Sequence, residues 1–214
     1  MAPATAALPS GSPALRRRDL QKEQTRFDLA AAAFELAKSR GLANVRVPEI
    51  AAAVGVSTRT FNNYFASKEQ AIAWLAGRHA AGMAGALRIT PAEEPLREAL
   101  MDAVIGQYRP GRDVELPPHW LSDFRSLVAH EPALHGEYLR AMASAERDLA
   151  DAIEAHAPGA RGLRARVLAA TVVGAERAAV MYWMENRSGS LVGTVRDALG
   201  QALAGIGEPA SPVR

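Results

Sequence analysis

The sequence predicts an all-α protein of about nine helices, arranged in two domains. Alanine, the strongest helix former, is the most frequent of the 214 residues, whereas aromatic residues make up only 6%. Apolar residues recur at helical spacing along most of the chain, without the strict alternation that is typical of half-buried strands. Because 49% of the residues are apolar and 22% are charged, the chain can bury a sizeable core.

Residues 1–18 are expected to form a disordered basic leader. The first 15 carry no charged side chain and include several prolines and serines, and three arginines follow them. The first helix comes next, with one apolar face formed by Phe27, Ala30, Ala31 and Phe34. We expect it to end at Gly41, because glycine readily adopts the left-handed conformation that closes a helix.

Two short helices joined by a tight turn are expected to follow. Pro48 suits the first turn of the second helix, whose apolar face consists of Val47, Ile50, Ala51 and Val54. Gly55 can end this helix, and Ser57 can cap a third helix over Thr58–Phe65. Small residues at the junction, a glycine in the turn and an apolar residue after it are what a helix–turn–helix requires. Residues 19–66 are therefore expected to form a three-helix module.

The later helices are longer and more apolar. We expect residues 67–206 to form one larger domain, followed by a loose tail at 207–214. Prolines and glycines mark the boundaries between its helices. The six helices are expected from Ser67 to about Leu87, around Leu96 to Val104, from Trp120 after Pro117 and Pro118, from Pro132 to Ala157, from about Leu163 to Arg187, and from Ser190 to Ile206.

One segment is more specific than the fold. The residues Ile50-Ala51 and Val54-Gly55-Val56-Ser57 run into Thr58-Arg59-Thr60-Phe61-Asn62-Asn63-Tyr64-Phe65-Ala66-Ser67-Lys68-Glu69. This combination closely resembles the recognition-helix signature of the TetR family of bacterial transcriptional regulators, over about residues 23–72. The resemblance implies an N-terminal DNA-binding domain and a larger helical domain that binds a small effector and forms a homodimer. It also implies that the third helix enters the major groove of a double-stranded operator.

The resemblance implies DNA-contact roles for nine residues. Thr58 and Arg59 are expected to reach base edges, where an arginine bonded to guanine discriminates by about 1–3 kcal/mol. Asn63 can contact a base or a phosphate. The expected phosphate contacts, which set register and affinity, are Thr60, Asn62, Tyr64 and Lys68. Ser57 caps the third helix, and Arg46 stands near the place where the family has a Ser or Thr that caps the second helix and touches a phosphate. Lys68 has an alternative interpretation as a solvated surface charge.

The charge distribution agrees with contact between the N-terminal part and a polyanion. Residues 1–80 carry a net charge of +5, and residues 81–214 carry a net charge of −3. This imbalance is modest and decides nothing alone.

In the TetR family, helices four to seven surround the effector. Their large aromatic residues and methionines are candidate ligand contacts, with core packing as the alternative for each: Trp74, Met83, Met101, Tyr108, Trp120, Phe124, Tyr138 and Met142. The long apolar helices favour an apolar or amphipathic effector, and the chain is similar to regulators that sense fatty-acyl-CoA-like molecules.

The last two helices are expected to form the dimer interface. The eighth helix is apolar on two faces, one of which has small residues that permit close approach of a second helix. The predicted interface residues are Val172, Ala175, Ala179, Tyr182, Val195 and Leu199. The alternative is that both faces belong to the core of the single chain.

Other classes of protein are less well supported. The chain has no cysteine, which excludes disulfides and thiolate metal sites, and no two histidines are spaced i, i+4. It has no nucleophile elbow, phosphate-binding glycine loop or dinucleotide fingerprint, so we predict neither an enzyme nor a cofactor. No run of 18 apolar residues or secretory signal is present, so we expect a cytoplasmic protein without a membrane partner.

The predicted function is therefore that of a DNA-binding transcriptional repressor, released from a palindromic operator by a small effector. The alternatives are a helical interaction protein or an unrecognised helical enzyme, neither of which would bind DNA. Salt-dependent binding to duplex DNA separates these classes, because phosphate neutralisation makes the affinity fall steeply with salt.

Overall fold

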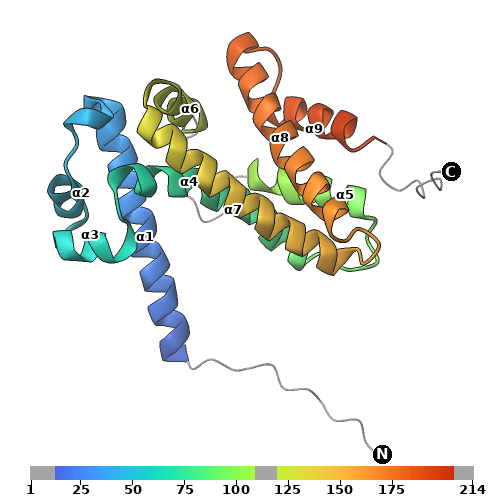
Figure 1. Cartoon of the computed structure of the whole chain (residues 1–214), viewed down its shortest axis with the longest axis horizontal. Coiled ribbons are helices and arrows are strands. Elements are labelled where there is room, and N and C mark those ends of the chain that lie inside the picture. Colours follow the sequence, from blue (N-terminus) through green and yellow to red (C-terminus); the bar gives the residue numbers. More distant parts are fainter. Residues whose placement is uncertain (1–12, 109–119, 205–214) are drawn as a thin grey trace, which may run out of the picture. The chain divides into compact units, whose positions relative to one another are not determined.

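A computed structural model describes residues 13–108 and 120–204 (Figure 1). Over these residues the chain forms nine α-helices and two short 3-10 helices, with no strand, which confirms the predicted all-α class. The chain divides into two compact units at Ile72, inside the fourth helix. This boundary lies six residues beyond the predicted one, because the first turn of that helix belongs to the N-terminal unit and buries Ala71 and Ile72.

The first helix, α1, spans Pro13–Arg40. Residues 13–18 are therefore helical, and the prediction of a disordered leader is wrong over this part. Proline is well tolerated in a first helical turn, where its missing N–H leaves no bond unmade. Residues 1–12 of the predicted leader lie outside the described residues. The helix ends before Gly41 as predicted: this glycine has a φ of 79° and its N–H donates to the carbonyl of Ala37 at 2.9 Å.

The helix–turn–helix forms where the sequence predicts it. After the 3-10 helix η1 (Leu42–Asn44), α2 spans Val47–Val54 and α3 spans Thr58–Tyr64. Gly55 adopts the left-handed conformation, with φ 74° and ψ 27°. The N–H of Val56 then bonds back to the carbonyl of Ala51 at 2.9 Å, which closes α2 and sets the turn into α3.

Aromatic and branched side chains hold the three helices of this unit together. Phe34 of α1, Ile50 of α2 and Phe61 of α3 are completely buried, and Phe65 directly after α3 is 2% exposed. The rings of Phe61 and Phe65 lie 5.8 Å apart between centroids. Because Phe61 and Phe65 are four residues apart, they fix one side of α3 against the core and leave the opposite side exposed.

The second unit contains the rest of the chain. Its helices are α4 (Lys68–Arg88, which begins in the first unit), α5 (Leu96–Ile105), η2 (Gly106–Tyr108), α6 (Trp120–His130), α7 (Pro132–His156), α8 (Leu163–Asn186) and α9 (Leu191–Ala202). The last helix ends at Ala202 and so is shorter than predicted. Ile206 and the predicted tail at 207–214 lie outside the described residues. The core is built on α8, which packs against both α7 and α9.

Among the described residues, α8 is the one helix long and apolar enough to cross a membrane, with a mean hydropathy of 1.2 over its most apolar 18 residues. The apolar composition has an explanation inside the unit. Residues such as Val172, Val173 and Val180 are buried in the core, and Glu176 is buried with polar partners on neighbouring elements. A core helix of a folded domain has these properties.

Candidate DNA-binding and effector sites

The exposed side of α3 carries most of the predicted DNA contacts. Thr58, Arg59, Asn62 and Asn63 are exposed, whereas Thr60 and Tyr64 are partly buried. Positions 58, 59, 62 and 63 fall on one side of a helix, opposite the buried Phe61. The structure therefore brings four polar side chains together on one exposed surface, which we call the α3 face.

Ser57 fixes the first turn of α3. Its hydroxyl oxygen accepts the backbone N–H of Thr60 at 3.1 Å, as an N-cap residue does, and its Oγ lies 2.9 Å from the hydroxyl of Thr60. The predicted cap is confirmed. Both hydroxyls are thus engaged in local structure, and they hold the backbone of the turn in place beneath Thr58 and Arg59.

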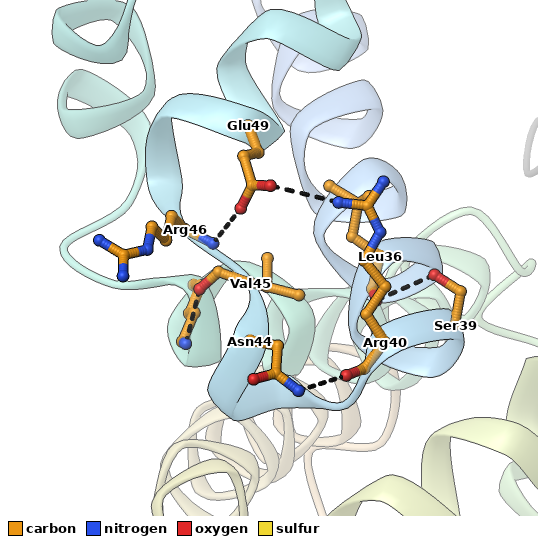
Figure 2. Close-up of polar contacts among 8 residues, drawn as sticks. Leu36, Ser39, Arg40, Asn44, Val45, Arg46 and Glu49 are labelled. Carbon is orange, nitrogen blue, oxygen red and sulfur yellow. Dashed lines mark hydrogen bonds and ion pairs between the residues drawn. The ribbon is translucent and has the colours of Figure 1, made fainter.

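Arg46 occupies the N-cap position of α2 but does not cap it through its side chain (Figure 2). A guanidinium has only donors, so it cannot accept a helix N–H. Glu49 instead fixes the start of α2. Its Oε2 accepts the backbone N–H of Arg46 at 2.9 Å, and its Oε1 lies 3.2 Å from Nη1 of Arg40. Figure 2 shows the guanidinium of Arg46 pointing away from Glu49 and Arg40. The side chain of Arg46 is exposed, so its guanidinium is free to attract a DNA phosphate electrostatically.

Lys68 has a structural partner that the sequence did not reveal. Its ammonium donates to the carbonyl of Leu42 at 2.6 Å and to the carbonyl of Val45 at 2.8 Å. These bonds tie the start of α4 to the segment between α1 and α2, and they use two of the three ammonium protons. The alternative of a solvated surface charge is therefore wrong, because Lys68 holds the backbone beside the helix–turn–helix. The phosphate contact stays a prediction, since one ammonium proton is not used by these two bonds.

A buried polar cluster lies inside the second unit. The side chain of Glu176 on α8 accepts a hydrogen bond from the hydroxyl of Tyr108, and its Oε1 lies 3.5 Å from Nε2 of His79 on α4. The imidazole of His79 is edge-on to two rings, with centroids 5.5 Å from Tyr108 and 5.8 Å from Trp120. The cluster thus connects α4, η2, α6 and α8.

The surroundings of Glu176 decide its charge. Burial raises the pKa of this carboxyl, but the interaction with His79, the hydrogen bond from Tyr108 and the charge of Arg125 outweigh burial and bring the pKa below its ordinary value of 4.5. Glu176 is therefore ionised at neutral pH. Burial first, and then the charge and hydrogen bond of Glu176, raise the pKa of Tyr108 well above 10.0, so its phenol remains a donor.

A cavity of about 320 Å³ lies among α6, α7 and α8. Its lining consists of Phe124, Arg125, Val128, Ala129, His135, Tyr138, Arg177, Ala178 and Met181. A volume of about 300 Å³ or more is typical of sites for small molecules. The cavity opens to solvent, because several of its lining residues, including His135 and Arg177, are exposed.

Two of the eight predicted ligand contacts, Phe124 and Tyr138, line this cavity. The others lie elsewhere: Met83 is completely buried in the core, Trp120 is buried beside His79, and Trp74 lies under the guanidinium of Arg78. The remaining three are partly buried and pack against the core: Met101, Tyr108 and Met142. Sequence reasoning missed Arg125 and Arg177, because a charged residue on an amphipathic helix resembles ordinary surface.

The predicted dimer interface needs a correction. Val172, Ala179, Val195 and Leu199 are buried within the chain's own core, so they cannot present a surface to a second chain. This outcome matches the alternative interpretation for those four residues. Ala175 is partly buried, and Tyr182 is 58% exposed.

A different side of α8, away from the buried Val172 and Ala179, carries an exposed apolar stripe. It comprises Leu163, Val167, Ala170, Ala178, Met181 and Tyr182, whose spacing places them on one side of the helix, and we call it the α8 stripe. No group of three or more His, Asp or Glu side chains among the described residues is arranged to hold a metal ion.

Comparisons with known proteins identify the family of the chain. Residues 29–72 match the family model of the bacterial regulatory proteins of the tetR family, and residues 94–207 match the model of the MftR C-terminal domain. The chain is 35% identical to the HTH-type transcriptional regulator TcmR of Streptomyces glaucescens over 156 residues, which cover 72% of this chain and 68% of TcmR.

Solved structures share the fold at low sequence identity. The fatty acid degradation regulator FadR of Bacillus halodurans superposes with a TM-score of 0.55 and 18% identity, over 85% of this chain and 96% of FadR. SmeT, the repressor of the Stenotrophomonas maltophilia multidrug efflux pump SmeDEF, gives a TM-score of 0.55 and 17% identity, over 88% of this chain and 96% of SmeT. The two family models together span both units of the chain. The protein belongs to the TetR family and is a DNA-binding transcriptional regulator.

Proposed function

We propose that the chain acts as a dimeric repressor, which leaves a palindromic operator when a small effector binds its second unit. The observation that carries the proposal is the α3 face: a capped helix, fixed by buried phenylalanines on one side, exposes polar side chains on the other. A recognition helix needs this combination of rigid support and exposed hydrogen-bonding groups.

Arg59 is the proposed main determinant of sequence choice. It is exposed in the first turn of α3, two residues after the N-cap Ser57, and its guanidinium can donate to O6 and N7 of the same guanine. Thr58 is a second base contact, and Asn63 contacts a base or a phosphate. The proposed backbone contacts, which set affinity, are Arg46, Thr60, Asn62 and Tyr64.

The α8 stripe is the proposed dimer surface. Its large apolar members outside the cavity, such as Leu163 at 77% and Val167 at 53% exposure, lose contact with water when a second copy covers them. Small residues between them, such as Ala170 and Ala178, allow two helices to approach closely. A two-fold dimer then presents two copies of α3 to successive major grooves, about 34–36 Å apart.

The proposed effector is an apolar or amphipathic small molecule, with an acyl-CoA-like molecule as the more specific candidate. The cavity among α6, α7 and α8 supports an apolar ligand through Phe124, Val128 and Met181. The names of FadR and SmeT, which share the fold, refer to fatty acid degradation and multidrug efflux. The effector acts by binding one conformation of the dimer better than the other, and it can shift their balance only by that difference.

The proposed site of action is the cytoplasm, where the operator is accessible. No cofactor and no membrane partner is included in this proposal, and the alternatives without DNA binding are not favoured by the family assignment.

The proposal is tested by fluorescence anisotropy with duplex DNA from beside the protein's own gene, titrated with salt. Wild type is expected to bind with an affinity that falls steeply as salt rises. Arg59→Ala and Tyr64→Ala are expected to weaken binding, whereas Arg166→Ala, an exposed arginine on α8, serves as the control. A folded dimer that binds neither this fragment nor any duplex from a genomic selection would contradict the proposal.

A further inference from the structure

The lining of the α6–α8 cavity is unbalanced in charge. Among the described residues that line it, none is acidic, whereas two arginines and one histidine are present: Arg125, Arg177 and His135. Apart from Tyr138, the other lining residues are apolar. The cavity therefore combines apolar walls with fixed positive charge.

Arg125 is the deeper of the two arginines. It is partly buried, and its Nε atom is buried without a hydrogen-bond partner among the described residues. A buried donor without a partner is costly, and an anion bound beside the part of Arg125 that lines the cavity offsets that cost through its charge. Arg177, by contrast, is exposed at the mouth of the cavity.

Both arginines act on the same phenol. Burial raises the pKa of Tyr138; the charge of Arg125 opposes that rise, the charge of Glu176 adds to it, and the charge of Arg177 opposes it more weakly. Both arginines line the cavity together with Tyr138. The buried carboxylate of Glu176 interacts with Arg125 and with Tyr138, but it is held by Tyr108 and His79 and does not line the cavity.

We propose that this cavity recognises an amphipathic anion, whose carboxylate or equivalent anionic group binds Arg125 and Arg177 and whose apolar body lies against Phe124, Val128 and Met181. This inference rests on the proposed function, since it names the chemical class of the effector. The fork of donors on a guanidinium matches the two oxygens of a carboxylate, and such charge-assisted bonds are the stronger kind.

A cationic ligand is the main competitor. Phe124 and Tyr138 offer ring faces that can attract an ammonium group. Two arginines in the same small cavity repel that ammonium, and no acidic residue among the described lining residues offsets them. The charge of the lining thus favours the anion.

The test uses three probes with the same ten-carbon chain: decanoate, decanol and decyltrimethylammonium. Binding is measured by isothermal titration calorimetry on the full-length protein, below the concentration at which the probes form micelles. Decanoate is expected to bind at least tenfold more tightly than decanol, and decyltrimethylammonium more weakly than both. Arg125→Gln and Arg177→Gln are each expected to lose at least tenfold in affinity for decanoate, with the affinity for decanol unchanged.

Arg166→Gln is the matched control, because Arg166 is exposed on the same helix and does not line the cavity. Arg177 is exposed, so its variant is expected to fold even if that of Arg125 does not. The proposal is overturned if wild type does not bind decanoate, if the cation binds as tightly as the anion, or if Arg177→Gln binds decanoate like wild type. Operator binding is measured on the same preparation: if it persists while decanoate fails to bind, only this inference fails.

Discussion

Replacing Lys68 by methionine separates a structural role from a DNA contact. The ammonium of Lys68 donates at 2.6 Å to the carbonyl of Leu42 and at 2.8 Å to the carbonyl of Val45. Methionine keeps much of the length and the apolar stem but removes both bonds. Hydrogen bonds to a charged group contribute about 1.5–3 kcal/mol each, and the two share one donor group that is only partly buried. We therefore expect the free energy of unfolding to fall by about 2–3 kcal/mol.

The assay is urea unfolding followed by circular dichroism, together with the salt dependence of operator binding. For a chain of this size the expected loss corresponds to a fall in Tm of about 4–12 °C. Lys22→Met, at an exposed position on α1, is the control and should change stability by less than about 0.5 kcal/mol. If Lys68→Met is as stable as wild type and the salt slope of binding falls by about one, Lys68 contacts a phosphate and the structural assignment is wrong.

Three further results are expected. Gly55→Ala should lower the free energy of unfolding by about 1 kcal/mol, because φ at Gly55 is 74°, although an added Cβ meets no atom within 4 Å. Gly85→Ala, inside α4 and also without close atoms, should raise the free energy of unfolding by up to about 1 kcal/mol. Equal shifts of the two variants in thermal unfolding would show that the positive φ of Gly55 does not cause the loss. Burial and Glu176 raise the pKa of Tyr108, and burial raises the pKa of Tyr138. The stability that these two neutral phenols contribute is therefore fully present below pH 10 and is lost as pH rises beyond 10.0. Urea midpoints at pH 9 and pH 11 should differ less in Tyr108→Phe than in wild type, and an unchanged difference would show that Tyr108 does not cause this loss. Val167→Glu on the α8 stripe should produce monomers in sedimentation analysis, whereas Arg166→Glu beside it should not; a Val167→Glu dimer would place the interface elsewhere.

The helix–turn–helix could be predicted because its signals are local. Gly55 ends α2 and Ser57 caps α3 through contacts within a few residues, so each is visible as a short pattern in the sequence. The apolar spacing of Phe61 and Phe65 likewise shows which side of α3 is buried. The two carbonyl bonds of Lys68 were missed because Leu42 and Val45 are 26 and 23 residues away, and no local pattern reports such a contact.

The second unit was less predictable for the same reason. Its helices are visible in the sequence, but α8 is apolar on more than one side, and only the packing of α7 and α9 decides which side remains exposed. Val172 and Val167 are equally apolar, yet one is completely buried and the other is 53% exposed. The cavity depends on three helices together, so its arginines could not be distinguished from surface charges in advance.

The most direct test of the central claim, that the α3 face reads the operator, is selection of binding sites from randomised duplex DNA by wild type and by Arg59→Gln. Wild type is expected to select a palindrome with a guanine at one symmetric position of each half-site. In Arg59→Gln the preference at that position alone should be lost or altered, because a bidentate contact to guanine is worth about 1–3 kcal/mol. An unchanged preference at every position, with or without weaker binding, would show that Arg59 does not read a base and would contradict the account.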